Sequence, residues 1–135
     1  MNFKYFFCSI LILWQLAACN SSAVSDCQQF RNGKFQLIDK QGNFDSIIIE
    51  RNETTQKENI TLVNETTEFN VKWINDCTAH LTFKSGKHEM KEFFKDKILV
   101  MQIEEIDLEN QTYVFSQSFR GDNKNKFYQK AKRVD

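Results

Sequence analysis

The sequence predicts a mainly β protein, an antiparallel meander that closes into a small barrel or clam with one short helix near 87–96. Short apolar runs alternate with turn residues along most of the chain, which is typical of successive antiparallel strands. Within runs such as 69–74, apolar and polar side chains alternate, so one strand face should be buried and the other wet. About seven or eight strands in roughly 110 residues favour closure of a curved sheet.

Eight segments carry the strand pattern, the last of them as a strand or an extended tail. They are 33–38, 44–50, 58–63, 69–74, 78–83, 98–108, 112–119 and 126–134. Aromatic and β-branched residues are frequent in them, and polar clusters between them, including 51–56 and 64–68, predict turns. The corner at 75–77 predicts a hairpin with Cys77 at its bend.

The segment 87–97 has a different period. Met90, Phe93 and Phe94 are spaced three and four residues apart. This spacing predicts a short amphipathic helix that lies over a face or an end of the sheet.

A single β domain is expected over residues 27–135. A chain of 135 residues is long enough for one buried core and too short for two. Hydrophobic residues make up 41% of it and 13 residues are Phe, which indicates a folded protein. Basic and acidic residues both number 18, so no net charge attracts nucleic acid.

The first residues have the organisation of an export signal. Lys4 ends a short positive region, and the apolar run 5–16 is shorter than the ~20 residues that a membrane-spanning helix needs. The run ends in Leu16-Ala17-Ala18-Cys19, which resembles a bacterial lipobox. Asn20 after the cysteine favours delivery to the outer membrane over retention in the inner one.

Three expectations follow for the N-terminal segment. Residues 1–18 should be a signal peptide cleaved before Cys19, and Cys19 should carry a lipid anchor on the cell envelope. Residues 19–26 should be a flexible tether. Cleavage after the small residues 21–23 would instead release a soluble secreted domain.

The four cysteines support export. Cys8 leaves with the signal and Cys19 takes the lipid, so Cys27 and Cys77 remain as a single pair in an oxidising compartment. We expect a disulfide between them. It would close a loop of about fifty residues and contribute ~4 kcal/mol of stability.

Side chains suited to catalysis or metal binding are few. His80 and His88 are the only histidines, and the run from His88 to Glu92 has Glu where a zinc-binding H-E-x-x-H motif needs its second imidazole. Strand alternation should point Glu104 and Glu105 to opposite faces, which separates them as a catalytic pair. We therefore expect no catalytic residue, no metal and no cofactor.

Basic residues gather near the C-terminus, with Phe127 and Tyr128 among them. Such a cluster can contact nucleic acid or anionic lipid. Export argues against nucleic acid, so lysines that protect a sheet edge are the better interpretation.

Sequons of the form N-x-[ST] are frequent. They begin at Asn20, Asn52, Asn59, Asn64 and Asn110. In a eukaryotic secretory protein they would mark glycan sites on surface loops, whereas in a bacterium they indicate only a polar surface. The lipobox favours the second interpretation, and 52, 64 and 110 fall at predicted turns.

Two motifs carry a resemblance to a known family. The pattern C-x-x-F-x-x-G-x-F begins at Cys27, and W-x-x-D-C-T begins at Trp73. With the lipobox, they make the chain similar to a family of small bacterial lipoproteins without an established activity. The resemblance covers 27–83 and implies the β architecture and the Cys27–Cys77 pair. Some members carry a DNA topoisomerase label, which a short exported chain does not support.

The predicted function is that of a non-catalytic cell-envelope lipoprotein. A lipocalin-like barrel could hold a small apolar ligand, or its aromatic side chains could simply fill the core. The residues that would line such a site are Phe35, Phe69, Trp73, Phe83, Tyr113 and Phe115. The alternative is a protein-interaction or inhibitor module that uses an exposed patch. The expected partners are the membrane and either a small apolar ligand or an envelope protein.

Overall fold

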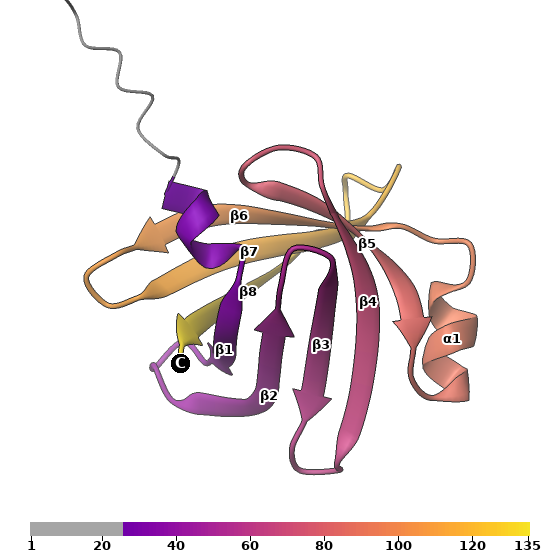
Figure 1. The fold of residues 1–135 in the computed structure, drawn as a ribbon, viewed down its shortest axis with the longest axis horizontal. Helices are drawn as coiled ribbons and strands as arrows, with labels where there is room; N and C mark the ends of the chain where they lie inside the picture. The colour runs from indigo at the N-terminus through magenta and orange to yellow at the C-terminus, as the bar shows by residue number, and fades with distance from the viewer. Residues whose placement is uncertain (1–25) are drawn as a thin grey trace, which may run out of the picture.

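The computed structural model describes residues 26–135, which form a closed barrel of antiparallel strands (Figure 1). A 3₁₀-helix, η1 (Asp26–Phe30), precedes the barrel, and α1 (His88–Phe94) connects β5 to β6. The strands are β1 (Gly33–Ile38), β2 (Phe44–Arg51), β3 (Thr55–Ile60), β4 (Glu65–Trp73), β5 (Thr78–Ser85), β6 (Leu99–Asp107), β7 (Thr112–Phe119) and β8 (Phe127–Arg133). Each strand pairs with its sequence neighbours, and β8 pairs back with β1. The predicted fold class is confirmed.

The interior of the barrel is filled by side chains that alternate along each strand. Phe35 on β1 lies opposite Ile49 on β2, and Val71 on β4 lies opposite Leu81 on β5. The largest fully buried apolar side chains are Phe30, Phe35, Ile49, Phe69, Leu81, Met101, Tyr113 and Phe115. Burial of each large apolar side chain contributes about 1.5–3 kcal/mol, so this cluster is the main source of stability.

The barrel has two different ends, which we call the base and the mouth. The base carries η1 and the turns that follow β2, β4 and β6. The mouth carries the turns that follow β1, β3 and β7, together with α1 at the end of β5 (Figure 1). Phe30 of η1 is fully buried, so η1 closes the base.

The boundaries of β3 and β4 differ from the expected ones. The strand expected at 58–63 ends at Ile60, and Leu62 and Val63 lie exposed in the following turn. Asn64 there adopts a φ of 52°, a left-handed conformation that Asn tolerates better than most residues. Much of the polar sequence expected as turns is strand instead, because a closed barrel offers backbone partners on both sides of every segment.

The predicted helix at 87–97 is present but shorter. It begins at His88 and ends at Phe94, because Lys95 leaves the helical conformation and Asp96 adopts a φ of 56°. The remaining turns still direct Phe94 over the end of the barrel, as the ring contacts described below show.

Several expectations fall on residues 1–25, which lie outside the described part of the chain. They are the signal peptide 1–18, the lipidation of Cys19 and most of the tether 19–26. Asp26, the last residue of that expected tether, begins η1. Within residues 26–135, no helix has the length and hydropathy needed to cross a bilayer.

Candidate functional site

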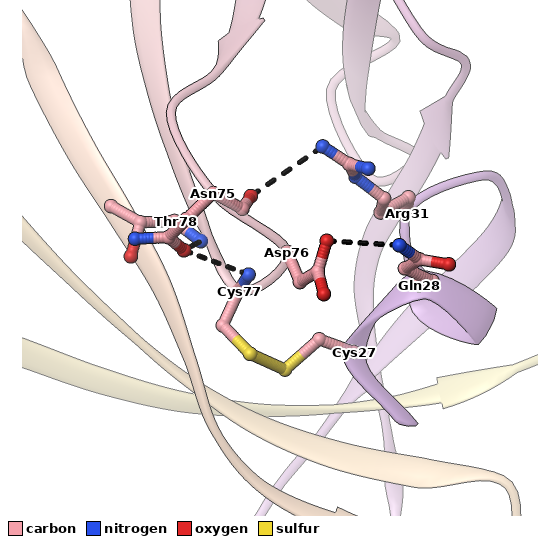
Figure 2. Close-up of a disulfide and its surroundings, with 7 residues drawn as sticks. All are labelled: Cys27, Gln28, Arg31, Asn75, Asp76, Cys77 and Thr78. Atoms are coloured by element: carbon pink, nitrogen blue, oxygen red, sulfur yellow. Dashed lines mark hydrogen bonds between the residues drawn. A yellow bond between two sulfur atoms is a disulfide. The ribbon is translucent and has the colours of Figure 1, made fainter. Parts of the chain in front are cut away.

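The base is closed covalently by the predicted disulfide, which is confirmed. Cys27 of η1 is bonded to Cys77 in the corner between β4 and β5, with their Cα atoms 5.1 Å apart (Figure 2). Beside it, Gln28 Nε2 donates a hydrogen bond to Asp76 Oδ1 at 2.9 Å. These contacts hold η1 against the corner, so the base offers no open entrance at this point.

A polar network lies buried inside the base. The Arg51 side chain is 4% exposed and donates to Gln56 Oε1 at 2.6 Å, to the Phe30 carbonyl at 2.9 Å and to the Tyr113 hydroxyl at 3.1 Å. Gln56 Nε2 in turn donates to Glu58 Oε1 at 2.7 Å. The guanidinium is thus engaged with groups from η1, β3 and β7. It ties these elements together rather than lining an open hollow.

Glu58 brings a carboxyl group into the barrel interior. It lies opposite Ile49 on β2 and Thr67 on β4. Burial raises the pKa of this carboxyl above its ordinary value, although the hydrogen bond from Gln56 and the positive charge of Arg51 favour its ionised form. The charged form of Glu58 is therefore disfavoured inside the barrel.

An aromatic cluster covers the core at the mouth. The Phe94 ring of α1 lies with its centroid 5.1 Å from that of Phe69, 6.4 Å from Phe83, 5.0 Å from Phe93 and 6.0 Å from Phe119. Such ring pairs contribute about 0.5–1.5 kcal/mol each beyond the burial of their surface. The short helix is therefore fixed to the barrel by its last residue.

A groove with a volume of about 490 Å³ opens beside this cluster, and we call it the mouth groove. Its lining residues come from α1, β6, β7 and β8. They are Phe93, Phe94, Leu99, Gln117, Phe119, Phe127, Tyr128 and Gln129. A concave, mainly apolar surface of this size with a few polar groups is typical of a small-molecule site.

The six aromatic residues predicted to line a ligand site lie mainly in the packed interior. Phe35, Phe69, Tyr113 and Phe115 are at most 1% exposed. The Trp73 ring lies near the base, 4.4 Å below the Arg31 guanidinium. Phe83 is half-buried and lines a second hollow, which shares Phe94 with the mouth groove. None of the six lines the mouth groove itself.

Sequence reasoning missed the residues that do line it. The sequence pattern places Phe93 and Phe94 only on the apolar face of a helix, and Phe127 and Tyr128 only among the basic residues near the C-terminus. The sequence did contain a signal for two of them. Phe127 and Tyr128 are aromatic residues at the start of a strand whose other residues are mostly polar, and exposed aromatic side chains can mark a binding surface. The contact between α1 and β7 depends on the closed barrel and could not be read from spacing.

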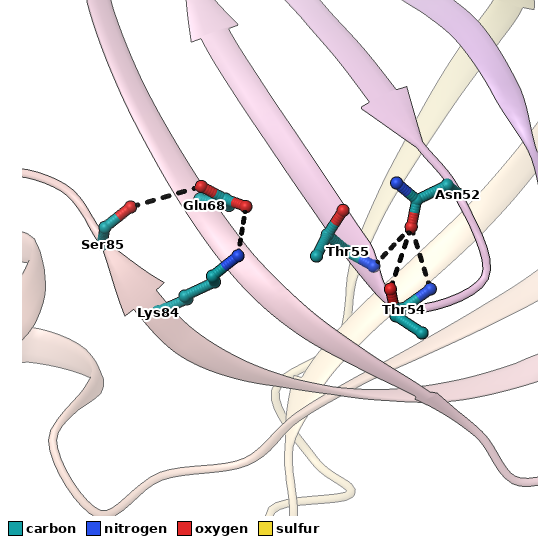
Figure 3. Close-up of polar contacts among 6 residues, drawn as sticks. All are labelled: Asn52, Thr54, Thr55, Glu68, Lys84 and Ser85. Carbon is teal, nitrogen blue, oxygen red and sulfur yellow. Dashed lines mark hydrogen bonds and ion pairs between the residues drawn. The ribbon is translucent and has the colours of Figure 1, made fainter.

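The surface of the barrel that faces away from its core, which we call the outer wall, carries polar side chains whose hydrogen-bonding groups pair with one another (Figure 3). Lys84 Nζ donates to Glu68 Oε1 at 2.7 Å, and this hydrogen bond lowers the pKa of the Glu68 carboxyl. At the turn after β2, Asn52 Oδ1 accepts hydrogen bonds from the backbone N–H groups of Thr54 and Thr55. These residues stabilise a turn and a strand pair, and they form no reactive cluster.

The sequons lie on this polar surface. Asn52, Asn64 and Asn110 occupy turns, as predicted, whereas Asn59 lies within β3. Asn59 Oδ1 accepts a hydrogen bond from the Thr66 hydroxyl at 2.7 Å. Asn110 Nδ2 donates a hydrogen bond to Asp107 Oδ2 at 2.7 Å, so the side chains of Asn52, Asn59 and Asn110 are all engaged in local hydrogen bonds.

The prediction that Glu104 and Glu105 face opposite sides is wrong. The register shifts between Ile103 and Glu105, which indicates a β-bulge that breaks the alternation. Glu105 lies opposite the outward residue Val114, and Glu104 Oε1 accepts a hydrogen bond at 2.8 Å from the outward Ser116 hydroxyl. Both carboxylates therefore lie on the outer wall, away from the mouth groove.

The two histidines do not meet. His80 lies on the outer wall of β5, opposite Lys72 on β4, and His88 begins α1. In the part of the chain that the structure describes, no three His, Cys, Asp or Glu side chains are grouped as metal ligands would be.

No family model, curated protein or solved structure matches this chain. Its fold and its site therefore define its class: a closed eight-stranded antiparallel barrel with a disulfide-closed base and an apolar groove at the mouth.

Proposed function

We propose that this protein is a non-catalytic, lipid-anchored binding protein of the bacterial cell envelope, and that it holds a small apolar ligand in the mouth groove. The observation that carries the proposal is the groove itself. Its lining of aromatic, aliphatic and amide side chains suits binding of an apolar body with one or two polar contacts.

The position of the groove agrees with an N-terminal anchor. The described chain enters the barrel at Asp26 in η1, at the base, and the groove lies at the opposite end. A tether to a lipid on Cys19 would therefore leave the mouth free to exchange ligand with the surrounding solution.

The anchor is tested by the mass of the protein extracted from membranes of its own host. The expected mass is that of residues 19–135 plus acyl chains, with a gain of two hydrogens on reduction of the disulfide. A mass that matches an unlipidated chain starting near Val24 would contradict the anchor and support a soluble secreted protein.

Ligand binding is tested by photolabelling of the full-length protein in phosphatidylcholine nanodiscs. The probe is a ten-carbon alcohol with a diazirine at its chain end, and peptide mass mapping locates the label. We expect label on β7 and β8 at the mouth, lost when Phe93 and Phe127 are both replaced with Ala. Both side chains are more than half exposed, so the double variant should fold.

Phe44→Ala is the matched control for this experiment. Phe44 is 56% exposed at the same end of the barrel but does not line the mouth groove. Labelling should survive this change. Equal loss in the control, or label spread evenly over the chain, would contradict a ligand site in the groove.

A docked envelope protein is the second candidate partner. The turn after β3 exposes Leu62 at 84% and Val63 at 57%, outside the groove, and exposed apolar side chains of this kind can mark a protein contact. Replacement of both with Ser should leave photolabelling unchanged. If it instead abolishes a complex detected by native electrophoresis of host membranes, the protein-interaction function is favoured.

A further inference from the structure

Lys97 does not line the mouth groove itself, but it contacts the rings of two residues that do. Its ammonium group lies 4.6 Å from the centroid of the Phe93 ring and 5.0 Å from that of Phe119. Both rings line the groove. None of the ion pairs found within residues 26–135 involves Lys97. Two rings that line the groove therefore hold a positive charge next to it.

Lys97 lines two neighbouring hollows together with other positive side chains. The second hollow, of about 500 Å³, shares Phe94 with the groove, and its lining includes Lys91, Lys95 and Lys97 against the single carboxylate of Asp96. A third hollow, of about 360 Å³, is lined by Lys97 and Arg120, again with Asp96. Positive side chains thus outnumber negative ones on both hollows next to the groove.

The charge of Arg120 also reaches His80 on the outer wall of β5. Burial lowers the pKa of His80, and the charges of Arg120 and Lys72 lower it further. No carboxylate contributes to this shift. A proton on His80 is disfavoured in part because the neighbouring charges are positive.

We propose that the ligand of the mouth groove is a single-chain amphipathic anion, whose hydrocarbon part lies against Phe93 and Phe119 and whose acidic head group pairs with Lys97. This inference rests on the proposed function, because it names the ligand class of the same groove. A charge-assisted hydrogen bond to the ammonium stabilises an anionic head group, whereas an amine of the same chain length meets like charge.

The anion is a free amphiphile rather than a lipid of the anchoring bilayer. The mouth groove lies at the end of the barrel opposite to η1, where the described chain begins. With a tether attached at the base, the groove would face away from the membrane surface. A bilayer lipid would have to leave its leaflet to reach it.

The test compares three photoreactive probes of one chain length on the full-length protein in phosphatidylcholine nanodiscs. They are the ten-carbon carboxylic acid, the alcohol and the amine, used at pH 8, where the acid is ionised. The measured quantity is the concentration that gives half-maximal label on β7 and β8. We expect the acid to need a roughly fivefold lower concentration than the alcohol, as for a partly exposed ion pair, and the amine a higher one.

Lys97→Gln should bring the ratio between acid and alcohol close to one. Lys132→Gln is the matched control, because Lys132 is an exposed lysine of β8 that lies opposite Thr112, at the base end of β7. It removes the same charge and should retain the ratio. High salt should also reduce the preference in the unchanged protein, since salt screens exposed charges.

Each alternative outcome separates the two proposals. Equal binding of acid and alcohol in the unchanged protein, or a preference retained in Lys97→Gln, overturns the anionic ligand but keeps the apolar site. Absence of groove label with all three probes overturns both. If phosphatidylglycerol in the nanodisc competes with the acid as well as the free unlabelled acid does, a bilayer lipid replaces the free amphiphile as the ligand.

Discussion

Arg51 shows how a single residue holds the base of this barrel together. A buried guanidinium is costly unless its N–H groups find acceptors. Here the acceptors come from η1, β3 and β7, so three elements that are distant in sequence converge on one side chain. The cost of burying the charge is offset only if all of these acceptors stay in place.

Removal of one acceptor tests this account. Tyr113→Phe deletes the hydroxyl that accepts from Arg51 and leaves a buried N–H without that partner. We expect a loss of about 1–3 kcal/mol in the free energy of unfolding, measured by urea denaturation. Tyr128→Phe is the control, because Tyr128 is 62% exposed, and it should change little. Equal effects of the two substitutions would contradict the role of the network.

Glu58 predicts a pH dependence of stability. Its pKa in the folded protein is raised above the ordinary value of 4.5, so between these two values the folded state binds more protons than the unfolded state. The contribution of Glu58 to the free energy of unfolding therefore falls as the pH rises from about 4.5 through the raised pKa.

Glu58→Gln removes this titration and keeps an oxygen to accept from Gln56. The variant should be more stable than the unchanged protein at pH 7, and the difference should shrink towards pH 4 in urea denaturation series. Glu105→Gln, on the exposed outer wall, should show no such trend. A stability difference for Glu58→Gln that stays constant with pH would contradict burial as the cause of the raised pKa.

At the scale of elements, the sequence predicts strands well where alternation is strong and poorly where it is absent. The bounds of β1 and β7 match the apolar runs at 33–38 and 112–119. For β3 the predicted range, 58–63, lies too far along the chain. The inward residues of β3, Gln56 and Glu58, are polar, so the apolar pattern indicates a strand that includes Leu62 and Val63 instead. Such a strand is recognisable only once its partners in the barrel are known.

The η1 helix is the element that depends most on the disulfide. It has a single turn, and Cys27 joins it to Cys77 across a separation of 50 residues. Replacement of both cysteines with Ser should lower the free energy of unfolding by about 4 kcal/mol, as the chain-entropy model gives for a loop of this length. Urea denaturation with and without reductant measures the difference.

The double Ser variant is its own control in this experiment. Reductant should destabilise the unchanged protein to the level of the variant and leave the variant itself unaffected. A variant as stable as the oxidised protein would show that η1 and the Arg51 network close the base without the covalent bond.

At the scale of the whole molecule, closure was predictable but the candidate site was not. Strand number and curvature favour a barrel, and the cysteine count gives the disulfide. The mouth groove arises because α1, β7 and β8 meet at one end, and this arrangement depends on the register of the closed sheet. The core and the rim are both aromatic, so composition alone could not tell Phe115 in the interior from Phe119 at the groove.

Because the barrel is closed, we expect slow hydrogen exchange in its first and last strands. β1 and β8 pair with each other, so neither is an edge strand. Amides of β8 should therefore exchange as slowly as those of β4, which lies between two partners. Mass spectrometry of peptides after deuterium labelling measures this. Exchange in β8 as fast as in the turn after β3 would contradict a closed barrel.

The disulfide also determines how the molecule responds to mechanical force. Tension that reaches η1 from the N-terminal side passes at Cys27 through a covalent bond to Cys77, in the corner after β4. The strands β1 to β4 lie inside the loop that this bond closes. The force is therefore transmitted through the disulfide and not along the backbone of these four strands. A domain held by its N-terminal side could thus be pulled without its first four strands being peeled away.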